Sequence, residues 1–374
     1  MPTTVTGDLL RELAGFQARG GCALSLYLDL AASETPTIPA TEARFRAALS
    51  AVEKAADRRV DGRDCRLALR ADLARIRAWW AYEFERGGVQ GLALFASSSD
   101  DFFEAVSLAE PVQSAFRIDY RLYLAPLVDR RRGEGALVAV VSREQGRIYR
   151  MREGRLVEIV DETEQQPGQH EQGGWSQARY RRHIENLVAN PLRTVGDVLD
   201  RRLRGGGELV LVLPEELRSA FVEKLSLNAR AAIVGYATAE SHAGPNALVA
   251  AVRPVLDEVD ARRHRAALER LEEELGRGGR ATAGWNDTLA AAYDGMVDTL
   301  LLSEAGARPV WQCVECLRAF AEDGTCPIDG IALTERADGD DIAIHTTLTG
   351  GGDVLRLGAG ALDRHDSIAA LLRY

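Results

Sequence analysis

The chain has 374 residues, with 46% hydrophobic residues, 27% charged residues and a formal net charge of −10. This length exceeds one ordinary core and predicts two or three soluble globular domains. The acidic balance argues against general, sequence-independent binding of nucleic acids, because neutralised phosphates supply most of that affinity. A polyanionic partner would have to be bound through local basic patches.

Neither a membrane-spanning run nor a charged-then-apolar leader is found in the sequence, so the cytoplasm is the expected compartment. The cysteines agree with this expectation. Cys22 and Cys65 stand alone, whereas Cys313, Cys316 and Cys326 form a cluster. Such a distribution is not a disulfide framework.

Residues 1–130 form a predicted N-terminal α/β domain without a catalytic constellation. Residues 23–30 alternate and are rich in strand formers, which predicts a core strand. Helical periodicity and further apolar runs predict the remaining elements. We expect helices over 40–57 and 65–85 and strands over 91–96, 102–108 and 120–126.

A polar, charged break at 130–135 precedes a predicted middle domain over 136–275. Residues 136–142 are apolar on both faces, as in a central strand. Short glycine-containing turns connect this strand to two more and predict a meander. Alternating strands and helices follow, so we expect a mixed sheet with helices on its faces. The expected elements are strands over 145–151, 155–160, 208–213 and 231–236 and helices over 215–225 and 246–275.

The third predicted domain covers 281–374 and carries a cysteine-rich insert at 311–331. Apolar runs predict a helix over 288–294 and a buried strand over 297–302. We expect further strands over 342–346 and 354–357, and a final helix in the last residues.

A long polar loop interrupts the middle domain. The segment QQPGQHEQ (165–172) has no apolar period, and GGWSQARYRRHIE (173–185) continues it into a helix that begins near Ser176. The loop therefore presents glycine, tryptophan and glutamine in front of arginines. An uncharged amide backed by cations suits a substrate that is an ester held on a polyanion.

This segment resembles the Gly-Gly-Gln loop of eukaryotic and archaeal class I release factors. It is closer to their bacterial relatives and to the Vms/Ankzf-like peptidyl-tRNA hydrolases, in which the glutamine is displaced. Two C-terminal segments, VDTLLLSE (297–304) and SIAALLRY (367–374), resemble the third domain of release factors and Pelota. The resemblance implies a ribonuclease-H-like middle domain and a Pelota-like α/β/α third domain.

The resemblance also implies a ribosomal A-site ligand that hydrolyses peptidyl-tRNA. Gln177 would position water against the ester carbonyl, because its amide both donates and accepts hydrogen bonds without a charge. Gly173 and Gly174 would let the backbone approach the ester closely. Trp175 is expected to stack on ribosomal RNA, and phosphates would be held by Arg179, Arg181 and Arg182. We expect a monomer and no membrane partner, and a translational GTPase is a further candidate partner.

Two alternatives remain open for this loop. Without a gap, Trp175 occupies the position of the glutamine in the Gly-Gly-Gln pattern, and Gln177 then serves only the helix surface. Gln169 and Gln172 are other candidates for the catalytic amide. A non-catalytic hibernation or stress factor that occupies the A site would keep the architecture without the chemistry.

The insert places Cys313 and Cys316 at the spacing of a zinc knuckle, and Cys326 and Asp329 repeat that spacing. Zinc accepts a carboxylate oxygen beside thiolates, so the four residues are candidate ligands of a structural zinc ion. A metal-free ribbon is the alternative. No catalytic cofactor is expected.

Overall fold

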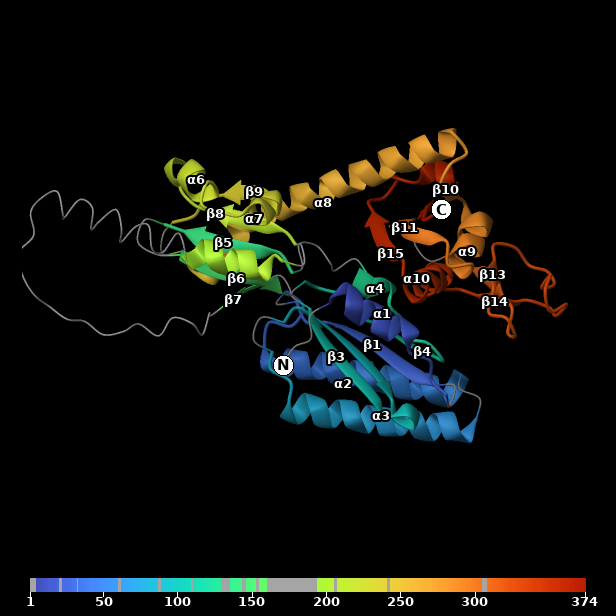
Figure 1. Cartoon of the computed structure of the whole chain (residues 1–374). Helices are drawn as coiled ribbons and strands as arrows, with labels where there is room; N and C mark the ends of the chain where they lie inside the picture. Colours follow the sequence, from blue (N-terminus) through green and yellow to red (C-terminus); the bar gives the residue numbers. More distant parts are fainter. Residues whose placement is uncertain are drawn as a thin grey trace, which may run out of the picture. The chain divides into compact units, whose positions relative to one another are not determined.

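The computed structural model describes residues 5–19, 22–31, 33–59, 62–86, 89–108, 110–128, 135–142, 146–152, 155–159, 194–204, 207–240, 243–304 and 308–374. The fold is mixed α/β with several sheets, as expected from the sequence (Figure 1). The chain forms two compact units. Unit 1 combines Met1–Arg131 with Arg263–Tyr374, and unit 2 is Arg132–Arg262. Among the described helices, none has the length and apolar character needed to cross a bilayer.

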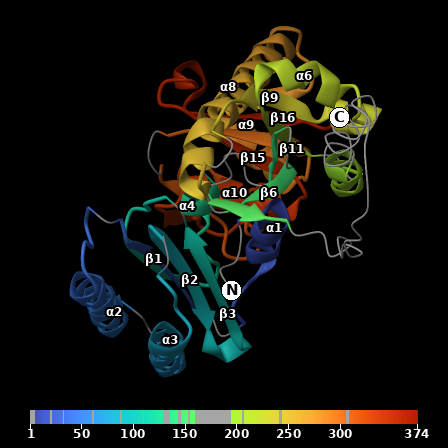
Figure 2. The same cartoon turned by 90° about the vertical axis from the view of Figure 1, so that its left-hand side faces the viewer.

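An antiparallel sheet organises the N-terminal part of unit 1, with strand order β3-β2-β1-β4. Alternation along β1 divides its side chains between two cores: Leu24, Leu26 and Leu28 lie on one face and Tyr27 on the other. Two helices lie side by side on the leucine face (Figure 2). The elements are β1 (Ala23–Asp29), β2 (Gly91–Ser97), β3 (Phe102–Leu108), β4 (Ala115–Asp119), α2 (Ile38–Arg59) and α3 (Arg63–Tyr82).

The C-terminal part of unit 1 is a three-layer α/β/α arrangement around a sheet of order β10-β16-β11-β15. In β16, Ile368 and Ala370 face the core under α9 and α10, whereas Ala369 and Leu371 face Leu271 of α8. This confirms the predicted α/β/α fold. The elements are α9 (Trp285–Tyr293), α10 (Gly339–Thr349), β10 (Ala281–Ala283), β11 (Val297–Ser303), β15 (Asp353–Leu357), β16 (Ile368–Leu372) and the second half of α8 (Pro245–Gly276), whose first half belongs to unit 2.

One buried core joins the two parts of unit 1, and α1 (Gly7–Gly15) packs against α10 within it. Polar groups of α10 tie the parts together. Asp341 Oδ1 accepts backbone N–H bonds from Leu124 (2.8 Å) and Ala125 (2.9 Å). His345 Nε2 lies 2.5 Å from the carbonyl oxygen of Leu122. Since both side chains are buried, these bonds fix the register of α10 against the N-terminal part.

Unit 2 contains a five-stranded sheet of order β7-β6-β5-β8-β9. β6 runs antiparallel to both of its neighbours, whereas β5, β8 and β9 are parallel. The predicted meander and mixed sheet are therefore confirmed. The elements are β5 (Leu137–Val141), β6 (Gly146–Arg152), β7 (Arg155–Glu158), β8 (Leu209–Val212), β9 (Ile233–Ala237), α6 (Glu215–Val222) and α7 (Leu227–Ala231).

Three of the predicted elements are wrong. Residues 342–346 lie in α10, because a short run that is apolar on all sides fits a buried helix as well as a strand. The predicted final helix is strand β16, which is buried on both faces. The strand predicted over 120–126 is replaced by the end of a turn and the short helix α4 (Ala125–Val128).

The prediction that Cys22 and Cys65 stand alone is also wrong. Their Cα atoms lie 5.7 Å apart and the two residues form a disulfide. Cys22 immediately precedes β1, and Cys65 lies in the first turn of α3. The pairing is invisible in the sequence because 43 residues separate the two cysteines.

Candidate metal centre and nucleic-acid interface

The cysteine-rich insert forms a small three-stranded sheet of order β13-β12-β14 in unit 1. Its strands are β12 (Val310–Gln312), β13 (Ala319–Phe320) and β14 (Thr334–Arg336). The strands have only two or three residues each, so this sheet has little apolar surface to bury. Small inserts of this kind are commonly held by a metal or a disulfide.

Two turns in the insert share one hydrogen-bond pattern. In the first, the N–H of Cys313 bonds to the carbonyl of Arg318, and the N–H of Leu317 bonds to the carbonyl of Cys313. Leu317 has a positive φ of 61°. This left-handed residue directs the chain back over Cys313 and Cys316, so both thiols lie on the inside of the turn.

The second turn repeats this pattern. The N–H of Cys326 bonds to the carbonyl of Ile331, and the N–H of Gly330 bonds to the carbonyl of Cys326. Gly330 has a φ of 70°, which glycine adopts without steric cost. Asp329 therefore stands where the second cysteine of the first turn stands.

The two turns bring four potential ligands together. The ligand atoms of Cys313, Cys316, Cys326 and Asp329 all lie within 4.8 Å of one another. Cys316 Sγ and Cys326 Sγ are 3.6 Å apart, and Cys313 Sγ lies 3.1 Å from Asp329 Oδ2. In a tetrahedral site with zinc–sulfur bonds of about 2.3 Å, neighbouring sulfurs lie roughly 3.8 Å apart. The donor set and spacing therefore fit a zinc ion.

The groups of the cluster differ in how readily they ionise. Burial and the neighbouring Asp329 carboxylate raise the pKa of the Cys316 thiol to about 12. Burial opposes ionisation of Cys326 as well, but the N–H groups of Asp329 and Ile328 outweigh it and lower its pKa. Hydrogen bonds from the thiols of Cys316 and Cys313 lower the pKa of Asp329. Cys326 and Asp329 thus favour their charged forms, whereas Cys316 must lose a proton when a metal binds, because the ligand is the thiolate.

The predicted loop residues lie outside the described residues. They are Gly173, Gly174, Trp175, Gln177, Arg179, Arg181 and Arg182, together with the alternatives Gln169 and Gln172. Their roles stay predictions from the sequence.

A basic surface that the sequence analysis missed lies on α2 and α3. Residues 38–82 carry ten basic and six acidic residues, a net charge of +4 in a chain of net charge −10. Arg63, Arg66 and Arg70 share one face of α3 and line an open hollow of about 400 Å³ with Asp57 and Leu67. Because α3 rises 1.5 Å per residue, the three arginines extend along roughly 10 Å.

These three arginines, which we call the α3 arginine stripe, are available to a partner. All three are exposed, and within the described residues none of them forms an ion pair. By contrast, Arg75 and Arg77 of the same helix pair with Asp101 and Glu53. Exposed, unpaired guanidinium groups suit contacts with phosphate oxygens. In the sequence, the one signal for this surface is that residues 38–82 have a positive net charge whereas the whole chain is acidic.

The amino-acid sequence is similar to those of known translation factors. Residues 123–261 match the family described as bacterial archaeo-eukaryotic release factor family 10. The peptide chain release factor subunit 1 of Archaeoglobus fulgidus is 28% identical over 243 residues, which cover 61% of this chain and 59% of that protein. The same factor from Aeropyrum pernix is 30% identical over 234 residues, which cover 58% and 62%. The chain is thus similar to the archaeo-eukaryotic release factors and, over residues 123–261, to their bacterial relatives.

The chain spans about 60% of the length of the curated proteins it matches, at 59% and 62% for the two above. Among solved structures, it resembles the crystal structure of an archaeal translation termination factor with 21% identity and a TM-score of 0.25, covering 98% of this chain and 96% of that one. The family match at 123–261 includes the glycine and glutamine loop that carries the resemblance in the sequence.

Proposed function

We propose that this protein binds the ribosomal A site and hydrolyses the ester of peptidyl-tRNA on stalled ribosomes. The observation that carries the proposal is the match of residues 123–261 to a release-factor family, because this range contains the GGWSQ segment. The two curated relatives described above are peptide chain release factors, which supports a role in translation.

In the proposed reaction, Gln177 positions a water molecule against the ester carbonyl. Its amide accepts a hydrogen bond from the water and donates one without bringing a charge into the site. Gly173 and Gly174 allow the backbone close to the ester, and a backbone N–H there would stabilise the developing oxyanion. Arg179, Arg181 and Arg182 would hold phosphates of the tRNA acceptor stem, and Trp175 would stack on a base.

Binding to the ribosome has support from the described residues as well. Although the chain is acidic overall, the α3 arginine stripe offers a local cationic surface for ribosomal RNA. A translational GTPase remains a proposed partner for delivery, by analogy with the release-factor lineage.

Peptide release tests the catalytic proposal. Ribosomes carrying a labelled nascent peptide on P-site tRNA are mixed with wild type or with Gln177→Ala, and free peptide is measured over time. We expect release by wild type and a fall of at least about 100-fold in the variant, in line with the loss of a positioning or oxyanion group. Absence of release by wild type, with ribosome binding intact, contradicts the catalytic proposal.

A second function is favoured by one observation, namely that Trp175 follows the glycine pair where the Gly-Gly-Gln pattern has glutamine. In this alternative the protein occupies the A site of idle ribosomes during stress and does no chemistry. Protection of tRNA-free ribosomes from nuclease or subunit loss, without peptide release at any concentration, would favour it.

We further propose that Cys313, Cys316, Cys326 and Asp329 hold a structural zinc ion. The proposal is supported by the convergence of their ligand atoms and by the repeated turn geometry. Bound zinc would replace the apolar core that the three short strands lack.

A further inference from the structure

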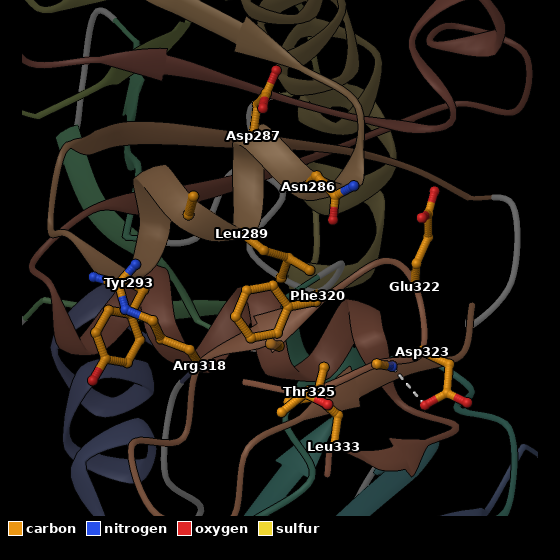
Figure 3. A pocket seen from close by; sticks show the side chains of 13 residues that line it. Asn286, Asp287, Leu289, Tyr293, Arg318, Phe320, Glu322, Asp323, Thr325 and Leu333 are labelled. Atoms are coloured by element: carbon orange, nitrogen blue, oxygen red, sulfur yellow. Dashed lines mark hydrogen bonds between the residues drawn. The ribbon is translucent and has the colours of Figure 1, made fainter. Parts of the chain in front are cut away.

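A hollow lies between α9 and the cysteine-rich sheet over residues 310–336, which we call the ribbon; both are in unit 1 (Figure 3). Its volume is about 420 Å³, within the range of ligand-binding pockets. Leu289 of α9 and Phe320 and Leu333 of the ribbon supply an apolar floor. The ribbon is fixed to α9 beside this floor, because the N–H of Ala321 bonds to Asn286 Oδ1 at 2.9 Å.

The rim of the hollow is acidic. Asp287, Glu322 and Asp323 line it, and within the described residues none of these carboxylates forms an ion pair. The one cation of the lining, Arg318, is already committed: it pairs with Asp294 and its guanidinium lies 4.2 Å from the centre of the Tyr293 ring. The hollow therefore presents uncompensated negative charge around an apolar floor. Such a surface complements a group that is cationic and partly apolar.

The neighbouring turns of the ribbon expose apolar side chains. Val314 is 63% exposed, Ile328 60% and Leu317 38%. Each lies within two residues of a candidate metal ligand, so they gather on the same small module. Apolar side chains that cluster on an exposed module, beside a hollow, indicate a surface for another protein more than a site for a small ion.

The wall of the hollow is built directly on the metal centre. The hydroxyl of Tyr293 donates to the carbonyl of Cys316 at 2.7 Å, and Arg318 closes the first turn through its bond to Cys313. Phe320 follows two residues later in β13. The position of the aromatic wall and floor thus depends on the two turns that hold the four ligands.

We propose that this hollow is a docking site for a basic, partly apolar segment of a partner protein. Arginine or lysine side chains of the segment pair with Asp287, Glu322 and Asp323, and an aliphatic or aromatic side chain between them packs on Phe320 and Leu333. The site lies outside the predicted catalytic loop and does not depend on the catalytic proposal. Its shape depends on the ribbon, so removal of the zinc ion proposed above would weaken docking; this last expectation rests on the zinc proposal.

Fluorescence anisotropy with the full chain tests this. The probe is a labelled octapeptide that alternates arginine and leucine, and its counterpart carries glutamate for arginine. We expect saturable binding of the arginine peptide only. The double variant Glu322→Gln with Asp323→Asn is expected to bind it about fivefold more weakly, since partly exposed charge pairs contribute roughly 0.5 kcal/mol each.

A matched pair of substitutions separates the hollow from general charge. Glu304→Gln with Asp363→Asn removes the same charge from exposed positions of unit 1 outside the hollow, and we expect it to leave the affinity unchanged. Thr325→Arg places a cation at the rim and is expected to abolish binding. Equal weakening by both double variants, binding of the glutamate peptide, or displacement of the probe by free arginine amide alone would overturn the proposal, as would no binding by wild type.

Discussion

Asp338 shows how one residue can fasten separate segments of the chain. It immediately precedes α10 and is only 5% exposed. Its Oδ2 lies 2.8 Å from Arg117 Nη1 of β4 and 2.9 Å from Arg336 Nη2. Arg336 also pairs with Asp119, so one small charged network connects β4 with the end of the ribbon. A buried carboxylate of this kind is costly unless its partners stay in place.

The protonation of Asp338 follows from these contacts. Burial alone would raise its pKa, but the hydrogen bonds and charge of Arg336, together with the charge of Arg117, outweigh burial and hold the pKa below its ordinary value. The native state therefore favours the carboxylate. Its stabilising contribution is complete above the unfolded pKa of about 3.9 and is lost as the pH falls through the lower, folded value.

We expect Asp338→Asn to lower the free energy of unfolding at pH 7 by about 2 kcal/mol. This is less than the roughly 3–5 kcal/mol for a fully buried pair, because the side chains of Arg117 and Arg336 are 29% and 22% exposed. The difference in Tm from wild type should shrink as the pH falls below about 4 and through the lower folded pKa, where native Asp338 gains its proton. Thermal unfolding followed by circular dichroism across pH 3–7 measures both effects.

Asp101→Asn is the control for this prediction. Asp101 pairs with Arg75, but its side chain is 98% exposed, so we expect little change in Tm at any pH. A control that destabilises as much as Asp338→Asn would show that the effect does not come from burial.

At the scale of elements, the proposed zinc site of the ribbon leads to a prediction about metal content. Purified protein should contain about one zinc ion per chain, and Cys326→Ser or Asp329→Ala should lose it, while Asp329→Cys should keep it in a four-thiolate site. Removal of the metal with a chelator should lower Tm, because the two turns of the ribbon are then no longer cross-linked by a common ion. Metal analysis by atomic emission and thermal unfolding check these expectations.

Cys22→Ser with Cys65→Ser provides the matched control, since these cysteines lie in a different part of unit 1 and pair with each other. Zinc content should be unchanged in this variant. A full zinc complement in Cys326→Ser and Asp329→Ala would rule out the proposed ligand set.

The sequence predicted elements whose pattern is local. The alternation of β1 and the continuous apolar run of β5 were sufficient to predict these strands, and the repeated spacing singled out the four candidate ligands that the structure brings together. The α10 segment was missed because a run that is apolar on all sides has no period to separate helix from strand.

Features that depend on distant residues were out of reach. The disulfide joins Cys22 to Cys65, and Asp338 meets Arg117 from more than 200 positions away. The hollow requires α9 and the ribbon to meet, which no spacing in the chain indicates. Local pattern specifies elements, whereas packing specifies which polar groups become partners.

At the scale of the whole molecule, charge is strongly segregated. Residues 38–82 carry a net charge of +4, so the rest of the chain carries −14. Such a molecule is repelled by a polyanion over most of its surface and attracted at one place. Orientation on RNA would then be set by electrostatics before any specific contact forms.

We expect substitution of the α3 arginine stripe (Arg63→Gln, Arg66→Gln and Arg70→Gln together) to weaken ribosome binding and to flatten its salt dependence. Each lost phosphate contact removes somewhat less than one unit from the slope of log K against log salt, so the slope should fall by about two. Binding to ribosomes measured by sedimentation at several salt concentrations gives the slope.

The control removes three positive charges that are already paired. Arg44, Arg75 and Arg77 form ion pairs with Glu34, Asp101 and Glu53. Their triple glutamine variant should keep the wild-type slope. If both triple variants lose affinity equally, net charge and not the stripe governs binding.

Unit 1 is assembled from two stretches of chain separated by the whole of unit 2, and this has a consequence for synthesis. The carbonyl of Ala14 in α1 meets His345 Nδ1 of α10 across 331 positions. During translation, the Tyr27 face of the N-terminal sheet can therefore be covered only in part, by α1 and residues 122–128, until α10 has left the exit tunnel, whereas unit 2 can complete its sheet earlier. A nascent chain that pauses after unit 2 would expose this face, and chaperone capture should concentrate there.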